Sequence, residues 1–149
     1  MRFAYLQQMT LAGLLGLSMI ATGMTAGPAL AQQAGTFDLE LNNLEPADGG
    51  CRLTFVAHNA TGTDLSLTSF DVAVFDGGGT VSDRLILEFG RLPQDKTRVV
   101  QFLLNRGCAE ISRLLINDSE ECVSAAGGES RICTDALVSS SRASIQFGS

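Results

Sequence analysis

Apolar side chains recur at every second position along most of this chain, and this period of two constrains its fold more than any other feature. In the first such segment, Phe37, Leu39 and Leu41 alternate with polar residues. Alternation of this kind is typical of half-buried β-strands. Similar segments begin at Leu53, Phe70, Leu85, Val100 and Leu137. The pattern therefore predicts about seven short strands and no long helix.

Turn-forming residues separate these segments, most clearly at residues 59–64, 76–79 and 92–96. Short strands divided by regular turns indicate an all-β domain, which we interpret as an immunoglobulin-like antiparallel β-sandwich. A small barrel is the alternative. We expect a β-bulge between Leu67 and Phe70, where the apolar face changes parity.

Three further expectations concern the second half of the chain. The dense apolar run at residues 111–116 is either a central strand or a short helix. Residues 117–135 are expected to form the one long loop. A single last strand is expected to carry Leu137, Ala143, Ile145 and Phe147 on one face.

The N-terminus has the layout of a removable secretory signal. Arg2 precedes an apolar run, and Ala29-Leu30-Ala31 supplies the small residues of a cleavage site. A retained membrane anchor is the alternative, but Gly23 and Pro28 interrupt the run. We therefore predict a signal peptide over residues 1–31, a disordered leader over 32–36 and the β-sandwich over 37–149. The predicted location is periplasmic or secreted, with no membrane span after cleavage.

The predicted mature chain is acidic. Residues 32–149 retain all sixteen acidic residues against nine basic ones, which gives a net charge of −7. Such a surface argues against binding nucleic acid or anionic lipid through a basic patch. The same residues include no Trp and no Tyr, so stacking on a sugar ring is disfavoured.

Four cysteines in an exported chain of this size predict two disulfides. In immunoglobulin strand order, Cys51 begins the second strand and Cys108 follows the fifth, and those two strands are antiparallel neighbours. This order predicts the bridges Cys51–Cys108 and Cys122–Cys133. The cysteine spacing matches neither a zinc site nor a C-x-x-C redox motif.

No residue pattern predicts catalysis or a cofactor. His58 is the only histidine, and Asp64 and Ser66 near it show no local signature of a catalytic triad. The acidic run at residues 117–121 groups three carboxylates, but it lacks the ligand spacing of an EF-hand calcium loop. We predict no catalytic residues, no metal ligands and no cofactor.

The acidic run suggests a contact surface instead. We expect the long loop to present a set of charged side chains to another protein: Asp118, Glu120, Glu121, Glu129 and Arg131.

Several segments resemble small exported proteins of Gram-negative bacteria that are labelled "Tat pathway signal sequence domain protein". These segments are Gly50–Val56, Asn59–Gly62, Phe75–Gly79 and Phe89–Pro93, with Arg98-Val99 and Gln101-Phe102 after them. The resemblance spans nearly the whole predicted mature chain, including all four cysteines. It implies an exported domain with no assigned activity. No twin arginine precedes the apolar run, so the general secretory route fits this chain better.

Two functions follow as hypotheses. The first is a non-catalytic exported module that contacts an unknown envelope protein. The alternative is a hydrolase or protease inhibitor that uses the disulfide-clamped loop over residues 117–135.

Overall fold

The computed structural model describes residues 35–149. The predicted signal peptide and residues 32–34 of the predicted leader lie outside this range. The last residue of that leader contacts the domain, since the Ala60 backbone N–H donates to the Thr36 carbonyl oxygen (2.8 Å).

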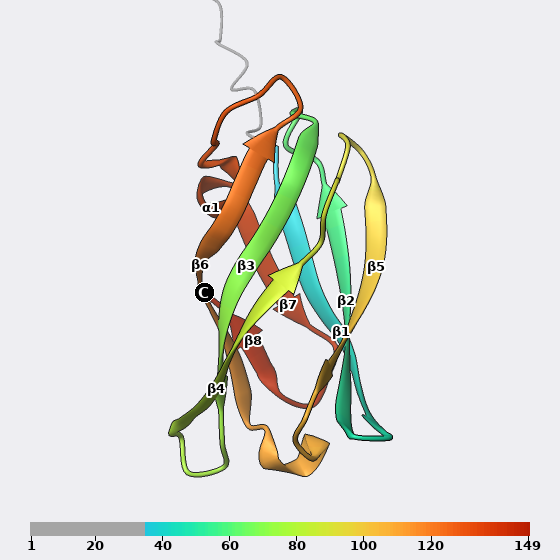
Figure 1. The fold of residues 1–149 in the computed structure, drawn as a ribbon, viewed down its shortest axis with the longest axis vertical. Coiled ribbons are helices and arrows are strands. Elements are labelled where there is room, and N and C mark those ends of the chain that lie inside the picture. Colours follow the sequence, from blue (N-terminus) through green and yellow to red (C-terminus); the bar gives the residue numbers. More distant parts are fainter. Residues whose placement is uncertain (1–34) are drawn as a thin grey trace, which may run out of the picture. The chain divides into compact units, whose positions relative to one another are not determined.

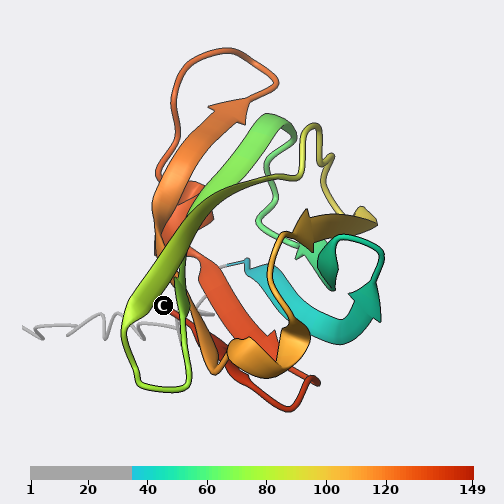
Figure 2. The ribbon, with the colours of Figure 1, turned by 60° about the horizontal axis from the view of Figure 1, so that its bottom comes forward.

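The described residues form a β-sandwich of two four-stranded sheets (Figures 1 and 2), as the alternation predicts. The first sheet has the order β5-β2-β1-β7, and the second has the order β4-β3-β6-β8. The eight strands are β1 (Phe37–Ala47), β2 (Gly50–Asn59), β3 (Leu65–Phe75), β4 (Val81–Glu88), β5 (Thr97–Leu104), β6 (Arg113–Ser124), β7 (Leu137–Ser141) and β8 (Gln146–Gly148). A 3-10 turn (Cys108–Glu110) precedes β6, and a one-turn helix α1 (Ile132–Asp135) precedes β7.

Phenylalanine rings fill the space between the sheets. Phe55 on β2 is fully buried, and its ring centroid lies 5.3 Å from that of Phe147 and 6.1 Å from that of Phe89. Phe70 on β3 lies 5.5 Å from Phe37 on β1. Because these pairs join the two sheets, the aromatic cluster holds the sandwich together.

The expected last strand is in fact two strands in different sheets. β7 pairs in parallel with β1, and β8 pairs in parallel with β6. Between them the Ser141 hydroxyl donates to the carbonyl oxygens of Ala143 (3.3 Å) and Ile145 (2.9 Å). These bonds stabilise the bend in which the chain leaves the first sheet for the second, so the single strand expected from the sequence was wrong.

The long loop expected over residues 117–135 was also wrong. β6 continues to Ser124, which leaves only a short connection before α1. Its polar half pairs with β3, and the register shifts three times, between Ile116 and Asp118, between Ser119 and Glu121, and between Val123 and Ser124. Pairing with a central strand therefore overrides the weak β-propensity of Asn117, Asp118 and Ser119.

Other expectations are confirmed. A register irregularity between β3 and β6 falls at Ser69 and Phe70, within the predicted interval, but its extra residue is in β6, and the extra residue of β3 lies earlier, between Leu65 and Leu67. The run at residues 111–116 leads into a strand and not a helix. β2 and β5 are antiparallel neighbours, and Cys51 forms a disulfide with Cys108, with a Cα–Cα distance of 4.9 Å.

Candidate functional site

The segment that follows β6 folds back along the end of that strand. Ser124 N–H donates to the Gly128 carbonyl (3.1 Å), and Ser130 N–H donates to the Cys122 carbonyl (2.7 Å). Between these bonds, Val123 and Glu129 form an isolated β-bridge. The connection between β6 and α1 is therefore a backbone-bonded return segment, which we define as residues 125–131.

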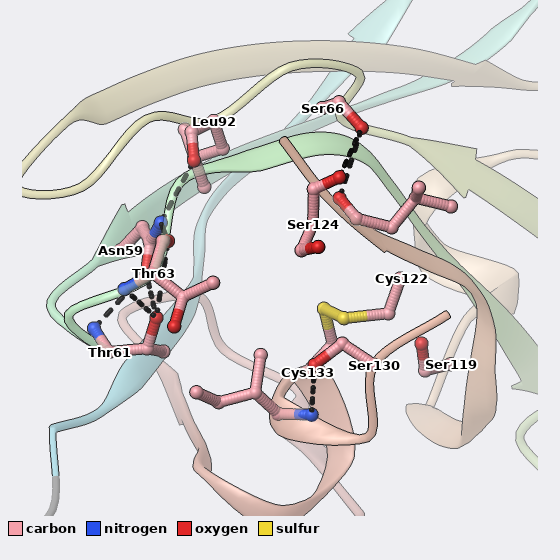
Figure 3. The surroundings of a disulfide bond; sticks show 12 residues. Asn59, Thr61, Thr63, Ser66, Leu92, Ser119, Cys122, Ser124, Ser130 and Cys133 are labelled. Atoms are coloured by element: carbon pink, nitrogen blue, oxygen red, sulfur yellow. Dashed lines mark hydrogen bonds between the residues drawn. A yellow bond between two sulfur atoms is a disulfide. The ribbon is translucent and has the colours of Figure 1, made fainter. Parts of the chain in front are cut away.

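A disulfide joins β6 to α1 across the return segment. Cys122 on β6 is bonded to Cys133 in α1, and their Cα atoms are 6.0 Å apart. Figure 3 shows Ser119 and Ser130 near this bridge. Both cysteines are buried, and Cys122 lies among the charged residues described next, so the disulfide restrains the backbone that carries them.

Those charged side chains surround one surface concavity of about 350 Å³. β6 contributes Asp118, Glu120 and Glu121, and the return segment contributes Glu129 and Arg131. All five residues expected to form an interaction surface are thus brought together. They come from a strand and its return segment, however, and not from one long loop. We call this surface the acidic concavity.

The charge of the acidic concavity is only partly neutralised. Four of its side chains are carboxylates, and Arg131 is the one cation among its lining residues. Arg131 already lies 3.4 Å from Asp135, an exposed ion pair that is worth little in water. Glu121 accepts a hydrogen bond from the Ser69 hydroxyl (3.3 Å). The surface therefore presents net negative charge to a cationic group.

A buried carboxylate lies on β3 beside β6. Asp71 is only 4% exposed, and it accepts hydrogen bonds from Arg84 on β4 and Asn117 on β6. The hydrogen bonds from Arg84 and then Asn117 lower the pKa of Asp71, against a smaller opposing effect of burial. The hydrogen bond between Arg84 and Asp71 raises the pKa of Arg84, and so does the negative charge of Asp71. The negative charge of Glu120 makes a smaller contribution in the same direction.

This network was not anticipated from the sequence. A signal for it exists, since Asp71 is the one charged residue inside a strand whose neighbours Phe70, Val72 and Val74 are all apolar. A carboxylate in such a place needs hydrogen-bonding partners from adjacent strands. The identity of those partners depends on the register, which the sequence does not reveal.

A second buried polar group organises the turn after β2. Asn59 is fully buried, and its side-chain amide donates to the carbonyl oxygens of Thr63 (2.8 Å) and Leu92 (2.8 Å). Its side-chain oxygen accepts from the Thr61 hydroxyl (2.7 Å). Figure 3 shows these bonds. Asn59 therefore has a structural role in the turn, as its turn-forming neighbours predict.

The catalytic candidates do not share hydrogen bonds. His58 Nδ1 lies 3.0 Å from the Thr97 hydroxyl, and Asp64 accepts from the Gln94 backbone N–H (2.8 Å). The Ser66 hydroxyl donates to the carbonyl of Val123 (3.1 Å). Within residues 35–149, no hydrogen bond joins any two of His58, Asp64 and Ser66.

The described residues form neither a metal-binding cluster nor a membrane-spanning helix. Over residues 35–149, no group of three or more histidine, cysteine or acidic side chains is arranged to hold a metal ion. Within the same range, no helix has the length and apolar character needed to cross a membrane.

Comparisons with protein families, curated proteins and solved structures found no match to this chain.

Proposed function

We propose that this chain is an exported, non-catalytic β-sandwich module that binds a basic segment of an envelope protein through its acidic concavity. The observation that carries the proposal is the convergence of Asp118, Glu120, Glu121, Glu129 and Arg131 around that one surface. Opposite charge on a partner would steer and orient its approach.

Rigidity supports a binding role for this surface. The disulfide Cys122–Cys133 and the backbone bonds of the return segment hold the two sides of the concavity before any partner arrives. A surface that is already ordered loses less conformational entropy on binding than a mobile loop does.

Export is supported by the two disulfides, which are consistent with an oxidising compartment outside the cytoplasm. On this proposal residues 1–31 are a cleaved signal peptide, and the mature protein is periplasmic or secreted. The neighbour order β1-β2-β5 and β4-β3-β6 also corresponds to that of an immunoglobulin variable domain, which supports an immunoglobulin-like assignment.

Export has a direct test. Mass spectrometry of protein recovered from the periplasm of a Gram-negative host should give a mature N-terminus at Gln32. Uncleaved chain in the cytoplasm would contradict the proposed location.

Binding is tested by site-specific crosslinking. A photo-crosslinking amino acid at Asp118 should capture a defined partner in the periplasm. Capture should be lost when Glu120→Lys and Glu129→Lys are combined, because the concavity then becomes positive. The matched control combines Asp48→Lys with Glu88→Lys, which changes the net charge equally at exposed sites outside the lining.

The outcomes separate the two functional classes. Capture that survives in the control and fails in the concavity variant supports the interaction module. Capture that is equal in both, or absent from the wild type, contradicts it. Turnover of a substrate that His58→Ala abolishes would favour the hydrolase instead.

A further inference from the structure

Strand β5 forms an open edge of the first sheet. It pairs with β2 on one side and has no strand on the other among the described residues. Asn59 N–H donates to the Lys96 carbonyl (3.1 Å), which extends the β2–β5 ladder by one pair. Hydrogen-bonded pairs alternate along an antiparallel ladder. The backbone groups directed away from β2 therefore belong to Thr97, Val99, Gln101 and Leu103.

Apolar side chains stand on the outer face of this edge. Val99 is 62% exposed and Leu103 is 56% exposed, both high values for residues of this size. Val56 on β2 lies opposite Val99 and is half-buried. The edge thus combines unpaired backbone groups with an apolar surface, the combination that favours addition of another strand.

The other open edges are better protected. β7 has five residues and β8 has three, so each offers a short template. β4 is as long as β5 but carries Asp83, Arg84 and Glu88. The single charged residue of β5 is Arg98, whose guanidinium donates to the Phe89 carbonyl (2.5 Å). Charged side chains on edges normally prevent pairing, and β5 has only this one, which is hydrogen-bonded within the same chain.

The sequence of β5 is complementary to itself in the antiparallel direction. When two copies are aligned on Gln101, Val99 of one lies opposite Leu103 of the other, and each Gln101 lies opposite its counterpart. In the same register Arg98 faces Leu104, so no like charges are opposed across the two strands. Val99, Gln101 and Leu103, which are aligned in this register, have free backbone groups, as an isologous pair requires.

We infer that β5 is a homodimer interface, in which two copies join edge to edge and form a continuous eight-stranded sheet across a two-fold axis. One pair of eight-residue strands covers less area than the roughly 1,600 Å² of a standard stable interface. The dimer is therefore weak and forms at high protein concentration. This interface is separate from the acidic concavity and does not depend on its function.

Sedimentation equilibrium of the mature protein between about 10 μM and 1 mM covers the range expected for a weak interface. The wild type should move from monomer towards dimer across this range. Gln101→Lys and Gln101→Glu should each weaken self-association at least tenfold, because like charges then face each other at the axis. An equimolar mixture of the two variants should recover a heterodimer, which also shows that both variants fold.

Gln94→Lys is the matched control, since it makes the same charge change in the exposed turn before β5. It should leave the dissociation constant unchanged. Added salt should strengthen the dimer because it screens the repulsion between copies that each carry a net charge of −7. Salt should instead weaken the binding of a basic partner at the acidic concavity, because it screens an attraction. A wild type that stays monomeric to 1 mM, or a mixture that does not associate, overturns the inference.

Discussion

The carboxylate of Asp71 on β3 is held by the guanidinium of Arg84 on β4, with the Arg84 Nε atom 3.2 Å from Asp71 Oδ1. Asn117 on β6 donates to the same carboxylate (2.8 Å). One side chain therefore connects three neighbouring strands of the second sheet. Asp71 is almost fully covered, but the side chain of its partner Arg84 is 65% exposed, so the pair stays partly screened by water.

This network predicts a loss of stability in acid. The pKa of Asp71 is lowered from 3.8 in the folded protein, so its stabilising effect is complete well above 3.8 and is lost as the pH falls through the lower folded value. Asp71→Asn should therefore unfold more easily than the wild type at pH 7, and the difference should shrink below pH 3.8. Urea denaturation across this range measures the effect. Asp48→Asn, at an exposed turn, serves as the control, and equal pH profiles for both variants would refute the prediction.

The two disulfides should differ in their contribution to stability. Cys51 and Cys108 are 57 residues apart, whereas Cys122 and Cys133 are 11 residues apart. By loop-closure entropy, replacing the first pair with alanine should cost about 4 kcal/mol, and replacing the second should cost about 3 kcal/mol. Urea unfolding of the two double variants tests this order. A larger loss for the Cys122–Cys133 pair would contradict this order. It would show that this disulfide stabilises the folded structure around the acidic concavity as well as restricting the unfolded chain.

Gly50 should not tolerate a side chain. Its φ of +148° disfavours other residues, and a Cβ atom there would lie 2.0 Å from the Leu104 carbonyl oxygen. Gly50→Ala should therefore destabilise the protein by about 3 kcal/mol, from strain and overlap together. Gly62→Ala is the matched control, because Gly62 has a φ of +82° but no atom within 4 Å of the added carbon. It should cost about 1 kcal/mol, and similar melting temperatures for the two variants would contradict this account.

Asn59 should be among the least replaceable polar residues. Asn59→Ala leaves the carbonyl oxygens of Thr63 and Leu92 without their side-chain donor. The Leu92 carbonyl keeps its hydrogen bond from the Leu65 backbone N–H (3.1 Å), so the cost is that of the lost hydrogen bonds. At about 1 kcal/mol for each lost bond, we expect a loss of about 2–4 kcal/mol in the free energy of unfolding. Asn105→Ala, at an exposed position, should change stability by less than about 0.5 kcal/mol. Comparable losses for the two variants would show that the Asn59 bonds are not stabilising.

Local alternation was sufficient to predict the strands that carry it. In β1, Phe37, Leu39 and Leu41 are buried as the pattern predicts, and in β5 the odd-numbered residues face water. The disulfide pairing also followed from strand order, because Cys51 and Cys108 lie at matching ends of neighbouring strands. These features depend on short-range patterns or on a simple topology.

Features set by distant partners were not predictable in the same way. The polar half of β6 is a strand because β3 pairs with it, and three register shifts accommodate its irregular sequence. The split between β7 and β8 depends on hydrogen bonds made by Ser141 within a serine-rich bend. The acidic concavity was anticipated as a set of residues but not as a shape, since its walls come from this unforeseen pairing.

The parallel pairing of β1 with β7 has a consequence for the order of folding. Phe37 lies opposite Leu137, so the first strand to emerge during synthesis is completed by one of the last. Until β7 is available, one edge of β1 stays unpaired, so the first sheet is completed only when nearly the whole chain is present. A high average sequence separation between contacting residues slows folding, so this domain should reach its native state on the slow timescale of other non-local β topologies.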